Sequence, residues 1–368
     1  MSDFVLAHAA GSPAQVLAAA CSDQLRGAKG HAFGFVYATS PLSLAFPEIV
    51  NILQERTGIQ HWVGTVGHGV CATGVEYFDQ PAIVVLTCGL DAYACQFIPA
   101  ATEPDDIHVE TGSEGPAAIG VVHADPRNPA VTAIVTNLSR HCGAYLVGGL
   151  TSAESSFPQV AGGRVVDGGV SGVLLGGRCL RVVVGLTQGC SPIGPPHSVS
   201  RSQGRILFSL DERPAFDVLR EEVGAAPNAD PRSWLANIHA AIPVAGSDRA
   251  DYVVRNIVGL GPEHGLVAIA DTIGPSDRVM FVRRDPHSAD RDLHRMLTDL
   301  KSRSPVKPTA GLYFSCLARG PNLFRDNAHE LKAIQKAFGD IPIVGFFGNG
   351  EIAHDRLYGY TGVLTLLI

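Results

Sequence analysis

An α/β protein with two related domains is the architecture that this sequence predicts. The first observation is its length of 368 residues, which exceeds what one ordinary core accommodates. The second is a composition of 46% hydrophobic and 17% charged residues, with glycine and proline scattered between apolar runs, which is typical of globular chains with many tight turns. The third is a pattern of strand, helix, strand, glycine bend and strand that occurs three times. From this pattern we expect mixed, largely parallel sheets in both domains.

Each copy of the pattern begins with a buried strand and continues with a helix whose apolar residues have helical spacing. The segments are 33–38, 44–58, 61–70 and 82–88 in the first copy, 118–124, 131–143, 145–155 and 168–177 in the second, and 310–316, 328–340, 342–353 and 360–368 in the third. A Val-Gly pair occupies the same place in each copy: Val63-Gly64, Val147-Gly148 and Val344-Gly345. This spacing favours a parallel pair with a right-handed crossover, and the glycines let each strand end turn sharply towards a ligand.

A segment rich in proline, serine and glycine, residues 190–204, separates the second copy from the third. It predicts a domain boundary near residue 203, with an N-terminal domain of residues 1–203 that holds two copies and a C-terminal domain of residues 204–368 that holds the third. Between the boundary and the third copy we expect inserted strands over 205–210, 251–260, 265–271 and 277–285, and inserted helices over 213–224, 231–242 and 288–303.

The formal net charge of −7 argues against nucleic acid as a partner, because such surfaces need clustered lysine and arginine. No apolar run approaches the roughly 18 residues of a membrane span, and the first residues lack a positively charged leader region. We therefore expect a cytoplasmic protein with no membrane insertion. The eight cysteines form no C-x-x-C pair, which argues against a structural zinc site, and the lack of a leader region argues against a disulfide framework.

The third glycine bend, residues 348–353, satisfies the loose dinucleotide-binding pattern G-x-G-x-x-A. That fingerprint needs a helix directly after the glycines, whereas the turn-like sequence HDRLYGYTG follows here. The chain also lacks the P-loop, G-x-S-x-G and H-E-x-x-H patterns. The bend is therefore interpreted as an architectural element, and no standard enzyme signature is present.

Two specific motifs lie near the C-terminus: S-C-x-x-R-G at 315–320 and G-F-x-G-N-G-E-I at 345–352. Together with residues 147–152, 167–175 and 187–219, they resemble the FIST family (F-box and intracellular signal transduction), over roughly residues 30 to 368. The resemblance implies a sensory module, proposed to bind a small-molecule ligand, that works with a separate histidine kinase, cyclase or other signalling output protein. Some members of that family bind haem and respond to nitric oxide, and eukaryotic relatives carry an F-box.

Two acids end the glycine bends, Glu154 in the second copy and Glu351 in the third, whereas the first copy has Val70 at that place. A carboxylate at a strand end can bind a cation, an amine or a guanidinium group, or accept a proton. The alternative is an acid that accepts hydrogen bonds from the amides of its own turn.

Cys316 and Arg319 follow a buried strand in the S-C-x-x-R-G motif. Arg319 can hold a carboxylate or phosphate ligand through two hydrogen bonds, or it can pair with Glu351 inside the protein, which we slightly favour. Cys316 is either a small core residue or a reactive thiol whose pKa a nearby cation lowers.

His68 and Cys71 lie in the glycine-rich stretch GHGVCATG. Because little side-chain bulk surrounds it, the His68 imidazole is accessible to haem iron, with Cys71 and Cys316 as alternative axial ligands. A histidine that is hydrogen-bonded within a turn is the other interpretation.

Three hypotheses about function follow. The leading one is a non-enzymatic, small-ligand-binding sensory protein that holds its ligand in a cleft between the two domains. Its candidate ligand-binding residues are Gly67, His68, Gly69, Cys71, Gly149, Glu154, Cys316, Arg319, Asn349, Gly350 and Glu351. The second is a haem-binding, nitric-oxide-responsive sensor. The third is a Cys-dependent enzyme with Cys316 as nucleophile and with Glu351 and Arg319 nearby.

Overall fold

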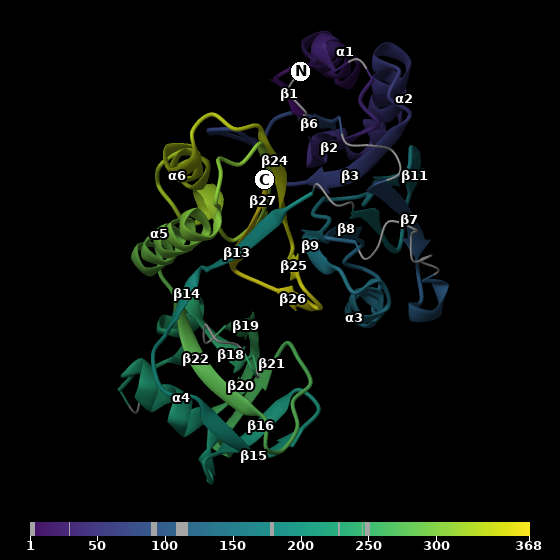
Figure 1. Cartoon of the computed structure of the whole chain (residues 1–368). Helices are drawn as coiled ribbons and strands as arrows, with labels where there is room; N and C mark the ends of the chain where they lie inside the picture. The colour runs from purple at the N-terminus through teal and green to yellow at the C-terminus, as the bar shows by residue number, and fades with distance from the viewer. Residues whose placement is uncertain are drawn as a thin grey trace. The chain divides into compact units, whose positions relative to one another are not determined.

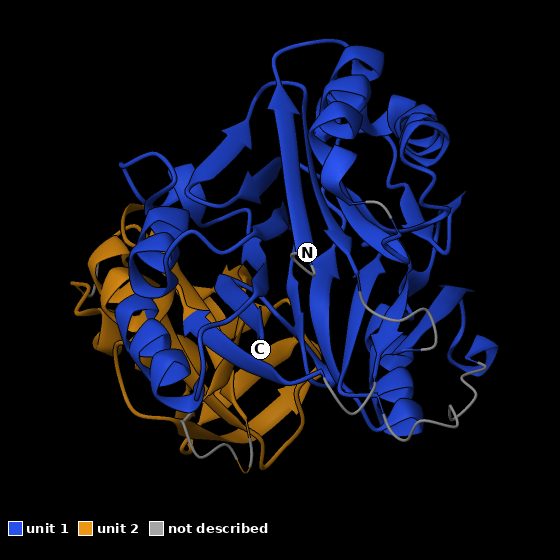
Figure 2. Cartoon of the chain, turned by 45° about the horizontal axis from the view of Figure 1, so that its top comes forward, with its two compact units in different colours: residues 1–187, 293–368 blue, residues 188–292 orange. Residues whose placement is uncertain are grey.

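The computed structural model describes residues 4–28, 30–89, 94–107, 117–176, 180–226, 229–244, 246 and 251–368. It divides into two compact units, coloured blue and orange in Figure 2. Unit 1 contains residues 1–187 and 293–368, and unit 2 contains residues 188–292. This division differs from the expected boundary near residue 203. All three segments predicted as copies lie in unit 1, and unit 2 interrupts the chain between the second and the third.

Unit 1 contains three six-stranded sheets. The first sheet has the order β1-β6-β2-β3-β10-β11, with bounds Phe4–Ala10, Ala82–Cys88, Phe33–Thr39, His61–Gly67, Gln159–Ala161 and Arg164–Val166. The second has the order β7-β12-β8-β9-β25-β26, with bounds Cys95–Ala101, Val170–Leu175, Ile119–Ala124, Tyr145–Leu150, Glu351–Ala353 and Arg356–Tyr358. The third has the order β13-β27-β23-β24-β4-β5, with bounds Val182–Gln188, Thr361–Leu367, Ala310–Cys316, Ile343–Gly348, Gly69–Ala72 and Val75–Phe78.

Each of these sheets is built around a parallel pair of strands joined by a helix. The pairs are β2–β3, β8–β9 and β23–β24, and the helices are α2 (Phe46–Thr57), α3 (Val131–Cys142) and α6 (His329–Phe338). The flanking pairs β6–β2, β12–β8 and β27–β23 are antiparallel. The sheets are mixed, as predicted, but the prediction that they are largely parallel is wrong. A crossover helix yields one parallel pair, whereas hairpins and return strands add antiparallel pairs.

A short hairpin follows each parallel pair, and it extends a neighbouring sheet instead of its own. Hairpin β4–β5 pairs with β24, hairpin β10–β11 pairs with β3, and hairpin β25–β26 pairs with β9. The three sheets thus exchange hairpins in a closed cycle. The exchange brings the ends of β3, β9 and β24 together in the middle of unit 1 (Figure 1).

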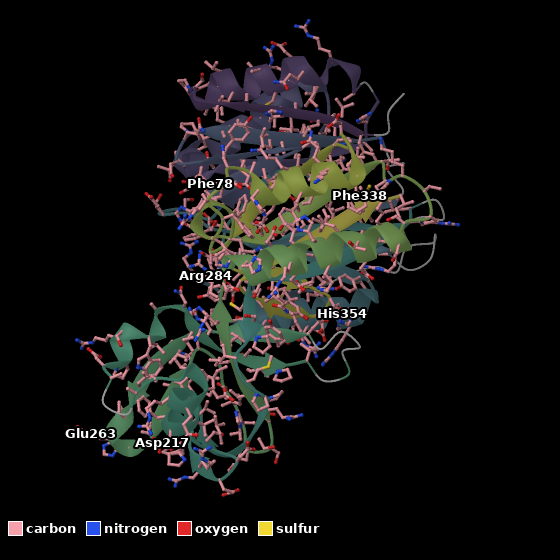
Figure 3. The ribbon with its side chains drawn as sticks, turned by 90° about the vertical axis from the view of Figure 1, so that its left-hand side faces the viewer. Phe78, Asp217, Glu263, Arg284, Phe338 and His354 are labelled. Atoms are coloured by element: carbon pink, nitrogen blue, oxygen red, sulfur yellow. The ribbon has the colours of Figure 1, made fainter. Side chains whose placement is uncertain are left out.

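Helices cover each of the three sheets of unit 1 (Figure 1) and bury apolar residues against them. α1 (Ala14–Gln24) and α2 pack on the first sheet, α3 packs on the second, and α5 (Pro286–Arg303) and α6 pack on the third. α2 and α3 end at Gly58 and Gly143, whose φ angles of 79° and 61° are left-handed and suit glycine. Phe78 and Phe338, labelled in Figure 3, belong to the third core. Among the described residues, no helix has the length and apolar character needed to cross a membrane.

The three Val-Gly pairs have a common physical cause. A Cβ atom at Gly64, Gly148 or Gly345 would lie 1.7, 1.8 or 1.6 Å from a carbonyl oxygen of the neighbouring parallel strand. Those oxygens belong to Val36, Val122 and Tyr313, which pair with the glycines in register. No side chain fits at such distances, so each strand needs glycine where it approaches its partner most closely.

Unit 2 is built on a nine-stranded sheet. Its main order is β19-β18-β22-β15-β16-β21-β20, with bounds Tyr252–Arg255, Ile238–Pro243, Arg278–Arg284, His197–Gln203, Ile206–Leu210, Leu266–Ile269 and Ile257–Gly261. β14 (Cys190–Pro192) pairs with β22, and β17 (Arg213–Pro214) pairs with β16. The apolar face of α4 (Ala215–Val223) packs into the core of this unit.

The helix expected over residues 231–242 is wrong. Two 3-10 turns, Pro231–Ser233 and Leu235–Asn237, lead instead into strand β18. The apolar residues of this segment fit the alternation of a strand and the spacing of a helix equally well. The segment forms a strand because it pairs with β19 on one side and with β22 on the other.

Candidate functional site

The candidate site lies where β3, β9 and β24 end. Counted from the glycine of each Val-Gly pair, His68, Ser152 and Asn349 occupy equivalent positions just beyond these strands. The backbone N–H of His68 donates to Ser152 Oγ at 2.9 Å, and the Ser152 hydroxyl donates to the carbonyl of Phe347 at 2.5 Å. Ser152 therefore joins all three strand ends. Sequence reasoning missed it, although its place in the second copy matches that of two named residues.

A second set of hydrogen bonds links the second strand end to the third bend. The Leu150 N–H donates to the carbonyl of Gly350 at 2.8 Å, and the Asn349 N–H donates to the carbonyl of Leu150 at 3.1 Å. Gly149 pairs with Glu351 in the β9–β25 ladder. Gly149 of the second bend therefore lies beside Asn349, Gly350 and Glu351 of the third.

The centre of this convergence is filled by the ring of Phe346. Cβ atoms at Gly67, Gly149 and Gly348 would lie 3.0, 3.3 and 3.1 Å from carbons of that ring. At Gly69, a Cβ would lie 2.4 Å from the Phe78 ring. These glycines are buried because aromatic rings and backbone occupy the space above them, so they serve close packing.

More rings surround Phe346. Tyr37, His123 and Phe314 occupy equivalent positions on β2, β8 and β23, and all contact the ring of Phe346. His123 is fully buried, and burial lowers the pKa of its imidazole to about 3, so the ring is neutral at pH 7. His68 is half-buried and Asn349 and Glu154 are exposed, so these three side chains lie at the rim of the convergence.

Glu351 is the buried acid of the site, with 1% exposure. Its Oε2 accepts hydrogen bonds from the backbone N–H and the hydroxyl of Thr361, at 3.1 and 2.6 Å. Its Oε1 has no partner within hydrogen-bond distance among the described residues, although the Cys316 thiol lies close enough to favour the ionised form of this carboxyl group. Burial raises the pKa of Glu351 to about 8, although Thr361 and the charge of Arg319 favour its ionised form. At pH 7 this carboxyl group therefore carries a proton.

Cys316 lies at the end of β23, beside Glu351, and is 8% exposed. Burial and the nearby charge of Glu351 raise the pKa of its thiol. Thr39 occupies the equivalent position in the first sheet, where its hydroxyl donates to the carbonyl of Gln80 in the turn before β6. Because its pKa is raised, the Cys316 thiol stays protonated near neutral pH, and a protonated thiol is a poor nucleophile.

Arg319 is fully buried, and its partner is not the expected Glu351. Its Nε and Nη2 donate to Glu330 Oε1 of α6 at 2.8 and 2.6 Å. Both side chains are completely enclosed. The preferred pairing predicted from sequence is therefore wrong, because α6 places a closer acid over the end of β23. Arg319 Nη1 has no hydrogen-bond partner among the described residues.

Glu330 organises a buried polar network that sequence reasoning missed. It accepts hydrogen bonds from the hydroxyls of Tyr313, at 2.7 Å, and Ser315, at 3.2 Å. Glu76 of β5 lies near it, and burial together with the charge of Glu330 raises the pKa of Glu76 to about 8. One signal was available: Glu330 lies on the apolar stripe of α6 with Ile334. An acid at such a position indicates a buried partner.

Cys71 lies apart from the rim of the site. It is fully buried in the third core, and its thiol donates to the carbonyl of Tyr313 at 3.8 Å. Burial raises the pKa of Cys71 strongly. A thiolate ligand to haem iron needs a deprotonated and accessible sulfur, so Cys71 and Cys316 do not fit haem. Among the predicted haem ligands, only His68 lies at the rim.

The chain matches the FIST N domain over residues 32–213 and the FIST C domain over residues 215–354. It is 29% identical over 333 residues to an uncharacterized protein of Mycobacterium tuberculosis (strain ATCC 25618 / H37Rv), covering 83% of each chain. An uncharacterized protein of Mycobacterium bovis is 29% identical over 325 residues, covering 83% of this chain and 82% of the relative. F-box only protein 22 of Homo sapiens is 43% identical over 54 residues, which is 14% of this chain and 13% of that protein. The resemblance predicted from the motifs is thus confirmed, and the chain belongs to the FIST family.

Proposed function

We propose that this protein is a small-ligand-binding sensor of signal transduction, with its ligand site at the rim where the ends of β3, β9 and β24 meet. FIST domains are generally associated with sensing in signal transduction. The observation that carries the proposal is the unpartnered Oε1 of buried Glu351. Buried polar atoms are nearly always paired, so an unpaired one at a strand end indicates a missing partner. The rim joins β3 and β9 of the N-terminal part of the chain to β24 of the C-terminal part.

The ligand class follows from the charges around Glu351. Its Oε1 becomes a hydrogen-bond acceptor when the carboxyl group loses its proton, and the charge of the nearby Arg319 is offset by Glu330. An amine or guanidinium group would pair with the carboxylate, as a cation favours the ionised form of an acid. The Asn349 amide, exposed two positions before Glu351, would supply further hydrogen bonds. We therefore propose a small ligand with a cationic nitrogen.

Thermal unfolding with a compound panel tests this function. The panel contains amino acids, amines, guanidines and small carboxylic acids. A ligand at about 100 times its Kd stabilises the folded state by about 2.7 kcal/mol, which raises the Tm measurably. We expect a compound with a cationic nitrogen to produce this shift, and Glu351→Gln to abolish it. Glu154→Gln is the matched control, because Glu154 occupies the equivalent position but is exposed.

Proton release gives a second readout. Because Glu351 holds a proton at pH 7, binding a cation there would displace it. Calorimetry in two buffers of different ionisation enthalpy measures the released proton directly. A panel that leaves the Tm unchanged, or a bound cation that releases no proton, would count against this site.

Haem is an alternative ligand for the same class of sensor, and it would depend on His68 alone. After reconstitution with haem, the Soret band should shift in His68→Ala and stay unchanged in Cys71→Ala. Identical spectra for the wild type and His68→Ala would exclude this alternative.

A Cys-dependent enzyme is the third candidate, and the protonated thiol of Cys316 counts against it. Iodoacetamide labelling at pH 7 separates the two possibilities, since a catalytic thiolate reacts fast and a buried thiol does not. We expect slow labelling of Cys316 in the folded protein and fast labelling in urea.

We also propose that the three strand–helix–strand–hairpin segments of unit 1 are copies of one ancestral unit. The shared strand order of the three sheets supports this proposal. A separate histidine kinase, cyclase or other output protein in the cytoplasm would receive the signal. Co-purification from the native cell with and without the identified ligand tests that partner.

A further inference from the structure

Unit 2 contains a cavity of about 560 Å³ that no predicted site residue lines. Its apolar wall includes Leu235 of the second 3-10 turn, Ile238 of β18 and Ile257 of β20. Arg232 and His239 are among its polar lining residues. The volume falls within the range of roughly 300–1,000 Å³ that small-molecule sites occupy. The cavity belongs to unit 2 alone, so it is separate from the rim described in unit 1.

Arg232 supplies a charge that has no partner among the described residues. The nearest acid in sequence is Asp230, and its carboxylate accepts a hydrogen bond from the backbone N–H of Arg232 at 3.0 Å. The guanidinium group itself makes no ion pair or hydrogen bond within the described part of the chain. A free guanidinium beside an apolar wall binds a carboxylate through two parallel hydrogen bonds.

The other charges near the cavity favour the same sign of ligand. Burial, and then the charge of Arg284, lower the pKa of His239 to about 4, so its imidazole is neutral at pH 7. Arg284, labelled in Figure 3, adds a second positive charge close to His239. The exposed Arg232 guanidinium disfavours a cationic ligand in this cavity, and a carboxylate forms an ion pair with it that an uncharged ligand cannot form.

We propose that this cavity binds a small organic carboxylate with a short aliphatic chain. The carboxylate pairs with the guanidinium of Arg232, and the aliphatic chain packs against Leu235, Ile238 and Ile257. This ligand has the opposite charge to the one proposed for unit 1, so the two sites respond to different compounds.

Calorimetric titration of the full chain with butanoate, hexanoate and octanoate tests the proposal. Hexan-1-ol and hexylamine are the probes of matched chain length. We expect hexanoate to bind about threefold to fivefold more tightly than either, which is the contribution of one exposed ion pair. Arg232→Gln should remove this preference. Arg205→Gln should keep it, because Arg205 is an exposed arginine of the same unit that does not line the cavity.

Val258 allows a second variant that adds a negative charge to the wall of the cavity. It lines the cavity and is 58% exposed, so Val258→Asp is expected to fold. The added carboxylate should weaken the binding of hexanoate more than that of hexan-1-ol, because only hexanoate is repelled by it. Three results would each overturn the proposal: no binding of any carboxylate, equal affinities for hexanoate and hexan-1-ol, or a preference that survives Arg232→Gln.

Discussion

Replacing Glu351 with glutamine should make the protein more stable at alkaline pH. Burial raises the pKa of this carboxyl from 4.5 to about 8, so between these values the folded state holds a proton that the unfolded state has lost. The free energy of unfolding therefore falls as the pH rises through this window. At about 1.4 kcal/mol per pKa unit, the loss is on the order of 4 to 5 kcal/mol by pH 8.

Glutamine keeps the size and one carbonyl oxygen of the side chain but does not titrate. That oxygen can still accept both hydrogen bonds from Thr361. Near pH 5 the two proteins should have similar stability, because Glu351 is then largely protonated in the folded state. At pH 8 the variant should be the more stable by several kcal/mol. Other titrating groups, including Glu76, are common to both proteins and cancel in the difference.

Urea unfolding at pH 5, 6.5 and 8, followed by tryptophan fluorescence, measures this difference. Trp62 is fully buried in the first core and reports on unit 1. Glu154→Gln, the same change at the exposed equivalent position, should shift stability by no more than about 0.5 kcal/mol at every pH. A stability difference between wild type and Glu351→Gln that does not change from pH 5 to pH 8 would refute the assignment of a buried proton to Glu351.

Three further variants test other parts of the fold. Gly345→Ala should cost about 3 kcal/mol or more, because its Cβ would lie 1.6 Å from the Tyr313 carbonyl oxygen, whereas Gly27→Ala meets no atom within 4 Å and should be neutral in the same urea titration. Arg319→Met leaves Glu330 buried without its cation and should cost roughly 3 to 5 kcal/mol in the same urea titration at pH 7. Burial opposes protonation of His197, but hydrogen bonds to Glu222 and Asp211 raise the pKa of its imidazole. The stability that this histidine contributes is therefore complete below pH 6.5 and is lost as the pH rises through the raised pKa. His197→Ala should lower the free energy of unfolding by about 1 kcal/mol at pH 6 and by less at pH 9.

Individual strands and helices were predictable where a short stretch of sequence showed a clear apolar periodicity. The strand expected over residues 33–38 and the helix expected over 131–143 correspond to β2 and α3. Apolar periodicity and a glycine at the helix end are properties of a short window of sequence, and they are sufficient for such elements. The apolar periodicity of residues 231–242 does not identify one type of element, since it suits both a helix and a strand. There the pairing partners, which lie far away in the sequence, decided the outcome.

Pairing between distant segments was the part that the sequence did not reveal. The hairpins look like continuations of their own units, yet each pairs with a strand of another sheet. Arg319 was assigned to the acid of the neighbouring bend, whereas Glu330 reaches it from a helix. The sequence alone does not show which of two acids pairs with an arginine. The position of helix α6, which carries Glu330, has to be known first.

The three strand ends share one scaffold but differ in chemistry, and this difference favours the third strand end as the site of the proposed ligand. At the position that follows each bend, the first copy has buried Val70, the second has exposed Glu154 and the third has buried Glu351. A buried valine offers no polar atom, and an exposed acid is already solvated by water. Only the third position combines an enclosed carboxyl group with an unpartnered oxygen among the described residues. A ligand that completes that hydrogen bond therefore gains most at the third strand end, beside the two other ends that Ser152 ties to it.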